Sequence, residues 1–218
     1  MLYYFRADLL EDEKRLKVAE SHGSVGVFHR KADKNMNKFA VIDTETTWGD
    51  AVMSIGAVIA DSKTFELIDK KYYILTPFKN HGGMYSYALY VNNAKPDLIC
   101  SREKAMDELN IFFTDHGILA VFAYNAAFDY HHLPELSHFE WYDIMKLAAY
   151  RQHNPKIPHW AECHGTGRLK RDYGVESIYR LLSDDRTYCE THNALFDAVD
   201  ELKIMKLLNH ELDKYIKL

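Results

Sequence analysis

The hydrophobic pattern of the chain is strand-like first and helical later. From residue 38 onwards, the runs FAVID (39–43), AVMSIGAVIAD (51–61) and FELIDKKYYIL (65–75) each have the length and β-branched content of a strand, with turn residues between them. Three consecutive strands with short connections favour an antiparallel meander. A loop rich in Gly, Asn and Tyr is expected at 76–98.

The second half of the chain alternates between helices and strands. Ser101 is placed to cap a helix that Gly117 ends, and the continuously apolar run at 118–124 indicates a strand buried on both faces. The remaining expected elements are a helix starting near Asn125, a strand at 139–142, and helices at 143–151, 175–182 and 193–209. This order predicts an α/β fold in which a mixed five-stranded sheet, three antiparallel strands followed by two parallel ones, is flanked by helices.

The chain is interpreted as one domain, residues 36–218, preceded by an appendage, residues 1–35. Within the appendage, the pattern predicts a charged amphipathic helix at 8–20 and a short apolar segment at 25–28. Because Met36 directly precedes the first strong strand, the upstream segment is either an accessory element or a consequence of start-site choice.

Composition and charge narrow the class of protein. The chain has 218 residues, 47% of them hydrophobic, and no apolar run reaches the roughly 18 to 20 residues of a membrane span, so we expect a soluble protein with no membrane partner. Three irregularly spaced cysteines favour a reducing, cytoplasmic location over a disulfide framework. A net charge of −5 argues against coating long nucleic acid, but not against a short contact anchored by metal ions.

Acidic residues mark the end of the first strand. Asp43 and Glu45 are two residues apart, and a strand has a side-chain period of two, so both carboxylates emerge on one face. Like charges placed in this way need cations nearby. The alternative is a pair of solvated or turn-capping carboxylates.

A second acidic position follows the buried strand at 118–124. In the segment Asn125-Ala-Ala-Phe-Asp129, a strand runs into a helix and delivers Asp129 to the strand's carboxyl edge, where ligand sites of open α/β sheets concentrate. Alternatively, Asn125 caps the helix and Asp129 complements the helix dipole. Phe128 is expected to pack in the core.

The third position opens the last helix. Asp197 lies outside the apolar stripe that runs through Leu195, Ala198 and Leu202, and His192 precedes it by five residues. By helical geometry alone, Asp197 is an ordinary residue of the polar face and His192 an ordinary loop residue.

Taken together, FAVIDTETT, YNAAFDY and HNALFDAVDELKI resemble, in order and context, the motifs of the DEDDh 3'-to-5' exonucleases. The resemblance covers roughly residues 38–209 and implies a ribonuclease H-like fold. WYDIMKLA, in which Asp143 opens a helix, is also similar to the segment that follows the second motif in that family. Two positions differ: Trp48 stands where the family often has Gly, and Tyr124 where it often has His.

The resemblance implies a site that hydrolyses phosphodiesters with two divalent cations, Mg2+ or Mn2+. The implied metal ligands are Asp43, Glu45, Asp129 and Asp197. His192 would be the general base, and Thr46, Trp48 and Asn125 are candidates for contacting the substrate, with Trp48 placed to stack on a base. The expected product is a nucleoside 5'-monophosphate removed from the 3' end of a single strand, with DNA slightly preferred over RNA and a polymerase or repair protein as a candidate partner.

Other interpretations stay open at this stage. An RNA-trimming exoribonuclease of the same fold fits the motifs equally well, and a catalytically silent module that binds nucleic acid would keep the fold alone. A zinc-stabilised binding module would use Cys163, His164, Cys189 and His192 as ligands. The basic sequence GRLKRDYG (167–174) either holds the nucleic-acid strand or forms a solvated surface.

Overall fold

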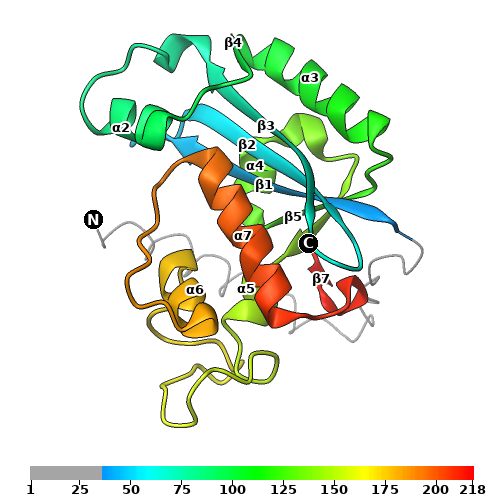
Figure 1. The fold of residues 1–218 in the computed structure, drawn as a ribbon, viewed down its shortest axis with the longest axis vertical. Helices are drawn as coiled ribbons and strands as arrows, with labels where there is room; N and C mark the ends of the chain where they lie inside the picture. Colours follow the sequence, from blue (N-terminus) through cyan, green and yellow to red (C-terminus); the bar gives the residue numbers. More distant parts are fainter. Residues whose placement is uncertain (1–35) are drawn as a thin grey trace, which may run out of the picture.

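The computed structural model describes residues 36–218, so the helix and apolar segment expected within residues 1–35 lie outside the described residues. The described chain forms one mixed sheet in the order β4-β3-β2-β1-β5-β6-β7, with helices on both faces (Figure 1). Its strands are β1 (Lys38–Thr46), β2 (Val52–Asp61), β3 (Leu67–Leu75), β4 (Leu98–Cys100), β5 (Ala120–Ala123), β6 (Glu140–Asp143) and β7 (Ile216–Lys217). The predicted α/β architecture is therefore confirmed.

The strand directions agree with the sequence, but the number of strands does not. β1, β2 and β3 form the expected antiparallel meander, and β5 and β6 run parallel to β1. The prediction of five strands was wrong because β4 and β7 are edge strands of three and two residues, paired with β3 and β6. Runs this short carry no readable alternation of apolar and polar residues.

The helices are α2 (Met84–Tyr90), α3 (Arg102–Asp115), α4 (Ala127–His132), α5 (Met145–Ala148), α6 (Val175–Ser183) and α7 (Ala194–Leu208). The side chains of α7 pack with those of Phe39 and Val41 of β1 in one core cluster, whereas α3 packs with Ala40 and Ile42 in another. α7 thus covers one face of the sheet and α3 the other, as Figure 1 shows. No helix within residues 36–218 has the length and apolar content needed to cross a membrane.

Two predicted elements differ in extent. The helix expected at 143–151 is a single turn, α5, because Asn154 then donates from its side-chain nitrogen to the carbonyl oxygen of Ala148 and the chain turns away. The segment expected to be a loop, 76–98, contains α2. The helices predicted at 175–182 and 193–209 are confirmed as α6 and α7 within two residues at each end.

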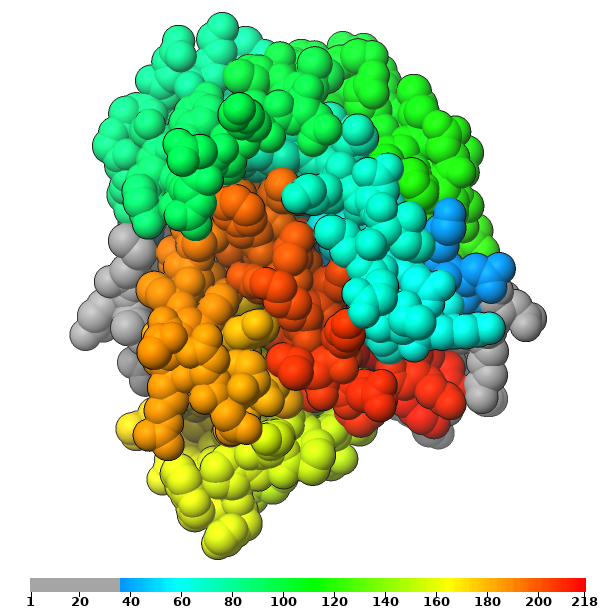
Figure 2. Space-filling model, viewed as in Figure 1, coloured from blue at the N-terminus to red at the C-terminus, as the bar shows by residue number. Residues whose placement is uncertain are grey.

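Residues 150–173, between α5 and α6, form a projection that we call the arm. It stands out as the yellow lobe beneath α6 in the space-filling view (Figure 2). Antiparallel bridges join Tyr150 to Arg168 and Cys163 to Leu169, so the arm has internal structure although it contributes no strand to the sheet.

Candidate active site

The candidate site lies where the end of β1 meets the first turn of α7. Asp43 and Glu45 follow Phe39 and Val41 at every second position of β1, on the face that α7 covers. The prediction that both carboxylates share one face is confirmed. The centre of the sheet therefore presents two acidic side chains to the amino-terminal end of a helix, where the helix dipole favours negative charge.

Two residues allow α7 to begin directly over this strand end. Gly56 of β2 is paired with Asp43, and a Cβ atom at this position would lie 2.2 Å from the backbone carbonyl carbon of Ala194. Asn193 caps α7 by accepting from the backbone N–H of Phe196, and its side-chain nitrogen donates to the hydroxyl of Tyr72, 2.8 Å away. Neither role was visible in the sequence.

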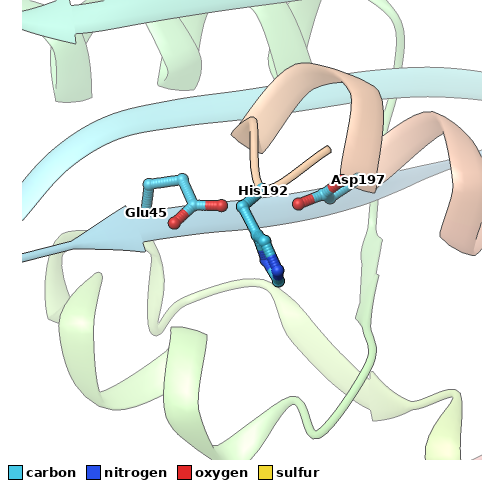
Figure 3. Close-up of side chains that lie close together, drawn as sticks. All are labelled: Glu45, His192 and Asp197. Carbon is cyan, nitrogen blue, oxygen red and sulfur yellow. The ribbon is translucent and has the colours of Figure 1, made fainter. Parts of the chain in front are cut away.

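The last motif meets the first one at this point. Ligand atoms of Glu45, His192 and Asp197 all lie within 4.8 Å of one another. Figure 3 shows the carboxylates of Glu45, from β1, and Asp197, from α7, on either side of His192. Asp197 is only 3% exposed, so the alternative of an ordinary polar-face residue was wrong, whereas the side chain of His192 is exposed.

Asp129 reaches the same site from α4. Its side chain is 2% exposed, and its Oδ1 accepts a hydrogen bond of 2.8 Å from the hydroxyl of Thr44. Thr44 separates Asp43 from Glu45 in β1, so one strand both supplies two carboxylates and orients a third. A helix-dipole role alone does not account for a carboxylate that is tied to the neighbouring strand in this way.

The carboxylates raise one another's pKa values. Burial raises the pKa of Asp43 well above its usual range, and the charges of Asp129, Glu201 and Asp197 add to this effect. Burial, followed by the charge of Glu190, raises the pKa of Glu45 to about 7. Burial is the larger cause of both shifts and neighbouring negative charge the smaller one, and a bound cation would offset both.

The other two motif carboxylates also have raised pKa values, Asp129 through burial and Asp197 through burial and neighbouring charges. Burial raises the pKa of Asp129 to about 7, although the hydrogen bond from Thr44 acts in the opposite direction. Burial, then the charges of Glu190 and Glu45, raises the pKa of Asp197 to about 9.

The donor set fits divalent cations that prefer oxygen. The buried Oδ2 of Asp43 has no hydrogen-bond partner among the described residues, although such atoms are nearly always paired in folded proteins. An unpaired buried carboxylate oxygen among three other carboxylates is suited to a hard ion such as Mg2+ or Mn2+. Asp43, Glu45, Asp129 and Asp197 are the residues that would hold it.

Glu201 is a fifth acidic residue that the sequence motifs did not indicate. It lies one helical turn after Asp197, is 1% exposed, and accepts a hydrogen bond of 3.0 Å from the backbone N–H of Tyr124. Burial and the charge of Asp129 raise its pKa. Only its i+4 spacing from Asp197 could have drawn attention to it, and a charged residue at that spacing is usually solvated.

The three candidate substrate residues lie at the rim of the site. Thr46 is the last residue of β1, and Trp48, in the following turn, is 59% exposed, with its indole nitrogen 3.4 Å from the sulfur of Met84 in α2. Asn125 has a left-handed backbone (φ 62°) and does not cap α4 through its side chain, so the capping alternative was wrong. Its backbone N–H donates to Asp143, which also accepts from the N–H of Met145 where α5 begins.

Phe128 is 37% exposed and packs against the ring of His132, so the prediction that it belongs to the core was wrong. α4 has only six residues, and the face of the helix that carries Phe128 does not point at the sheet.

The zinc alternative finds no support among residues 36–218. Within this part of the chain, Glu45, His192 and Asp197 form the one group of three or more acidic, His or Cys side chains close enough to share a metal ion. Cys163 lies in the arm and Cys189 is an exposed residue of the segment before α7, and neither joins that group.

Comparison with known proteins identifies the fold. No family model and no curated protein matches the sequence. Among solved structures, the nuclease domain of 3'hExo, a DEDDh family member bound to rAMP, matches with a TM-score of 0.60 and 13% identity over 86% of this chain and 98% of that one.

Two further solved structures have similar scores. The structure of a 3'-exonuclease in 3'-end specific recognition of a histone mRNA stem-loop matches this chain with a TM-score of 0.58. The identity is 13%, over 94% of this chain and 73% of that one. Cell-death related nuclease 4 matches with a TM-score of 0.56 and 12% identity, over 84% of this chain and 67% of that one. The chain therefore has the fold of 3'-exonucleases that include a DEDDh family member, as the motif resemblance implied.

Proposed function

We propose that this protein is a metal-dependent 3'-to-5' exonuclease that releases nucleoside 5'-monophosphates from the 3' end of single-stranded nucleic acid. One observation carries the proposal: on a fold shared with 3'-exonucleases, Glu45 of β1 and Asp197 of α7 lie within 4.8 Å of His192, and the charges of Asp129 and Asp197 act on Asp43 two residues before Glu45. The raised pKa values of the four carboxylates, caused first by burial, support a cation site over a set of surface charges.

Each side chain has a role that follows from its position. Asp43, Glu45, Asp129 and Asp197 would hold two divalent ions, Mg2+ or Mn2+, which when bound supply charge stabilisation at the phosphate and an acidified water. His192 is exposed beside Glu45 and Asp197, so its imidazole can accept the proton of the attacking water and pass it to solvent. Thr44 and Glu201 keep Asp129 and the end of β5 in position.

The rim residues would hold the strand end. The exposed indole of Trp48, supported by Met84, offers a face on which the terminal base stacks, and Thr46 and Asn125 lie where backbone or sugar contacts are needed. A polymerase or repair protein that presents such ends is a candidate partner.

DNA is the slightly preferred substrate, and RNA is the second candidate. Two of the similar structures are described with histone mRNA or rAMP, which supports RNA for a protein of this fold. A 2'-hydroxyl is the chemical difference that the site has to distinguish.

The test is digestion of matched 5'-labelled single-stranded DNA and RNA with Mg2+ or Mn2+. We expect a ladder that shortens from the 3' end and is lost in Asp129→Ala. The exposed Asp115→Ala, at the end of α3, is the matched control and should digest as the wild type does. If the wild type binds either strand without cleaving it, the protein is a silent binding module and the proposal fails.

A further inference from the structure

The arm, residues 150–173, differs in charge from the rest of the protein. It contains five cationic residues and two acidic ones, in a chain whose net charge is −5. The cationic residues are Arg151, Lys156, Arg168, Lys170 and Arg171. A basic segment on an acidic protein creates a local positive potential that attracts a polyanion.

The arm is held in a defined shape. Asn154 is fully buried, and Ile157 and Leu169 are 5% and 6% exposed, so the arm packs its own small apolar base against the domain. The backbone N–H of Leu169 donates to the carbonyl of Ala149, and that of Arg151 donates to Gly167. Because its base is fixed, the arm presents its surface side chains in a constant arrangement.

Aromatic and cationic groups share the outer surface of the arm. Trp160 is 75% exposed, the largest exposed fraction among the large hydrophobic side chains of residues 36–218. Lys170 and Arg171 are exposed, and the contact of Lys170 with the carboxylate of Glu162 is long, at 3.8 Å. Lys156 is paired with Asp184 at 3.0 Å and is therefore less available to bind a phosphate.

The last residue of the arm, Tyr173, is linked to the candidate active site through Tyr124. The carbonyl oxygen of Tyr173 accepts a short hydrogen bond from the hydroxyl of Tyr124, the residue that precedes Asn125. The backbone N–H of the same Tyr124 donates to Glu201, which lies one turn after Asp197 on α7. The end of the arm that carries Lys170 and Arg171 is thus linked to the site, whereas the carbonyl oxygen of His153, near the other end, accepts from His210 beyond the carboxyl end of α7.

We propose that the arm binds the single-stranded nucleic acid upstream of the 3' nucleotide that is being removed. Lys170 and Arg171 contact phosphates and Trp160 stacks on a base, the combination that proteins use to hold single strands without regard to sequence. The inference rests on the proposed function because it assigns the arm to the same substrate. Its consequence is an enzyme that holds long strands more tightly than very short ones.

The test compares two substrates in the full-length protein. One is the p-nitrophenyl ester of thymidine 5'-monophosphate, which occupies only the metal site, and the other is a 30-nucleotide single strand. In Lys170→Glu/Arg171→Glu and in Trp160→Ala, we expect KM for the long strand to rise about tenfold, with hydrolysis of the ester unchanged. The salt dependence of that KM should weaken in Lys170→Glu/Arg171→Glu and stay unchanged in Trp160→Ala, which removes no charge. Lys63→Glu/Lys70→Glu, exposed residues near the β2–β3 turn, is the control with the same change in charge and should behave as the wild type does.

A binding measurement distinguishes failure of this inference from failure of the proposed function. Anisotropy of a labelled 30-nucleotide strand, measured with the Asp129→Ala protein, reports the arm without any cleavage. If the arm substitutions leave that affinity and the KM for the long strand at the values of the control variant, the arm does not bind the strand and the inference is wrong. If the wild type cleaves neither substrate but loses strand binding when the arm is changed, the arm proposal holds and the proposed exonuclease activity fails.

Discussion

His192 combines an exposed side chain with a backbone φ of 53°, an uncommon conformation for a residue other than glycine. Such conformations persist where the surrounding structure needs them, and here the adjacent Asn193 is fixed by its cap and by Tyr72. The imidazole is therefore placed beside Glu45 and Asp197 by backbone geometry and not by its own packing.

We expect His192→Ala to lower kcat by about two to four orders of magnitude, the usual contribution of a general base, while the metal ligands remain in place. Steady-state kinetics on single-stranded DNA, together with a Mn2+ titration, measure the two effects separately. The exposed His138→Ala is the matched control. Full turnover in His192→Ala would remove the histidine from the mechanism.

Protonation of the carboxylates predicts how stability depends on pH. Unfolded carboxyls have pKa values near 4, whereas the folded values are about 7 for Glu45 and Asp129 and about 9 for Asp197. The folded state thus binds more protons between these limits, so the metal-free protein should lose stability as pH rises from about 4 to about 9. Melting curves in EDTA should show Tm falling across this range, and saturating Mg2+ or Mn2+ should reverse most of the loss. A Tm that is independent of metal at pH 8 would contradict the cation site.

At the residue scale, sequence spacing predicted the location of the motif carboxylates but not their supports. A period of two was enough to place Asp43 and Glu45 on one face of β1. Thr44 and Glu201 were missed because their roles depend on partners 85 and 77 residues away. No local pattern encodes a contact of that kind. The roles of the motif residues themselves stay predictions until they are tested.

At the scale of elements, the position of α7 depends on the absence of a side chain in β2. Gly56→Ala would place a Cβ 2.2 Å from backbone atoms of Ala194, a separation that only movement of the helix or the sheet can relieve. We expect a loss of stability of about 1 to 3 kcal/mol, the usual cost of overpacking, and a weaker affinity for Mn2+ because Asp197 moves with the helix. Denaturant unfolding and metal titration would measure both effects.

Gly82→Ala is the control for this substitution because an added Cβ there meets nothing within 4 Å. If Gly56→Ala unfolds with the wild-type midpoint and binds Mn2+ normally, the close approach is not required for the site.

The segment that carries His192 is held by α6 and α7. The hydroxyl of Tyr188 donates to Asp200 at 2.6 Å, and its carbonyl accepts from the side chain of Arg180 at 2.7 Å. Tyr188→Phe removes only the first contact, so we expect kcat to fall about three- to tenfold, with KM and metal affinity unchanged.

Tyr142→Phe, which also loses a hydrogen bond to a carboxylate, is the control for that prediction because its partner Glu140 lies in β6. Equal kcat values in Tyr188→Phe and Tyr142→Phe would mean that the contact with Asp200 does not position the histidine.

Elements with long, repeated patterns were predicted well. β1, β2 and α7 have nine or more residues each, and their sequences are largely apolar: β2 is buried on both faces, and α7 buries its apolar stripe together with a few acidic residues. α5 was predicted too long because the apolar residues Ala149 and Tyr150 follow its last residue, Ala148. The helix ends there, where the side chain of Asn154 donates to the carbonyl oxygen of Ala148. β4 and β7 were missed because pairing at a sheet edge, and not composition, defines them.

At the scale of the whole molecule, charge is segregated. Buried carboxylates collect at the end of β1 while cationic residues collect on the arm, so the modest net charge of −5 conceals two strongly charged regions. A net charge of −5 opposes extended electrostatic contact with nucleic acid over the average surface, but not over the arm. Similarly, 13% identity to solved exonucleases accompanies a shared fold because few positions besides the motif and core residues are constrained by it.

The carboxylates proposed to hold metal ions come from β1, α4 and α7, which are far apart along the chain. During synthesis, Asp197 leaves the ribosome long after Asp43 and Glu45, and it reaches them only when α7 docks on the completed sheet. Under the proposed function, a growing chain lacks the assembled centre and does not cleave the nucleic acids around it. Hydrolysis would begin only when α7 has docked, so the topology would protect against premature cleavage.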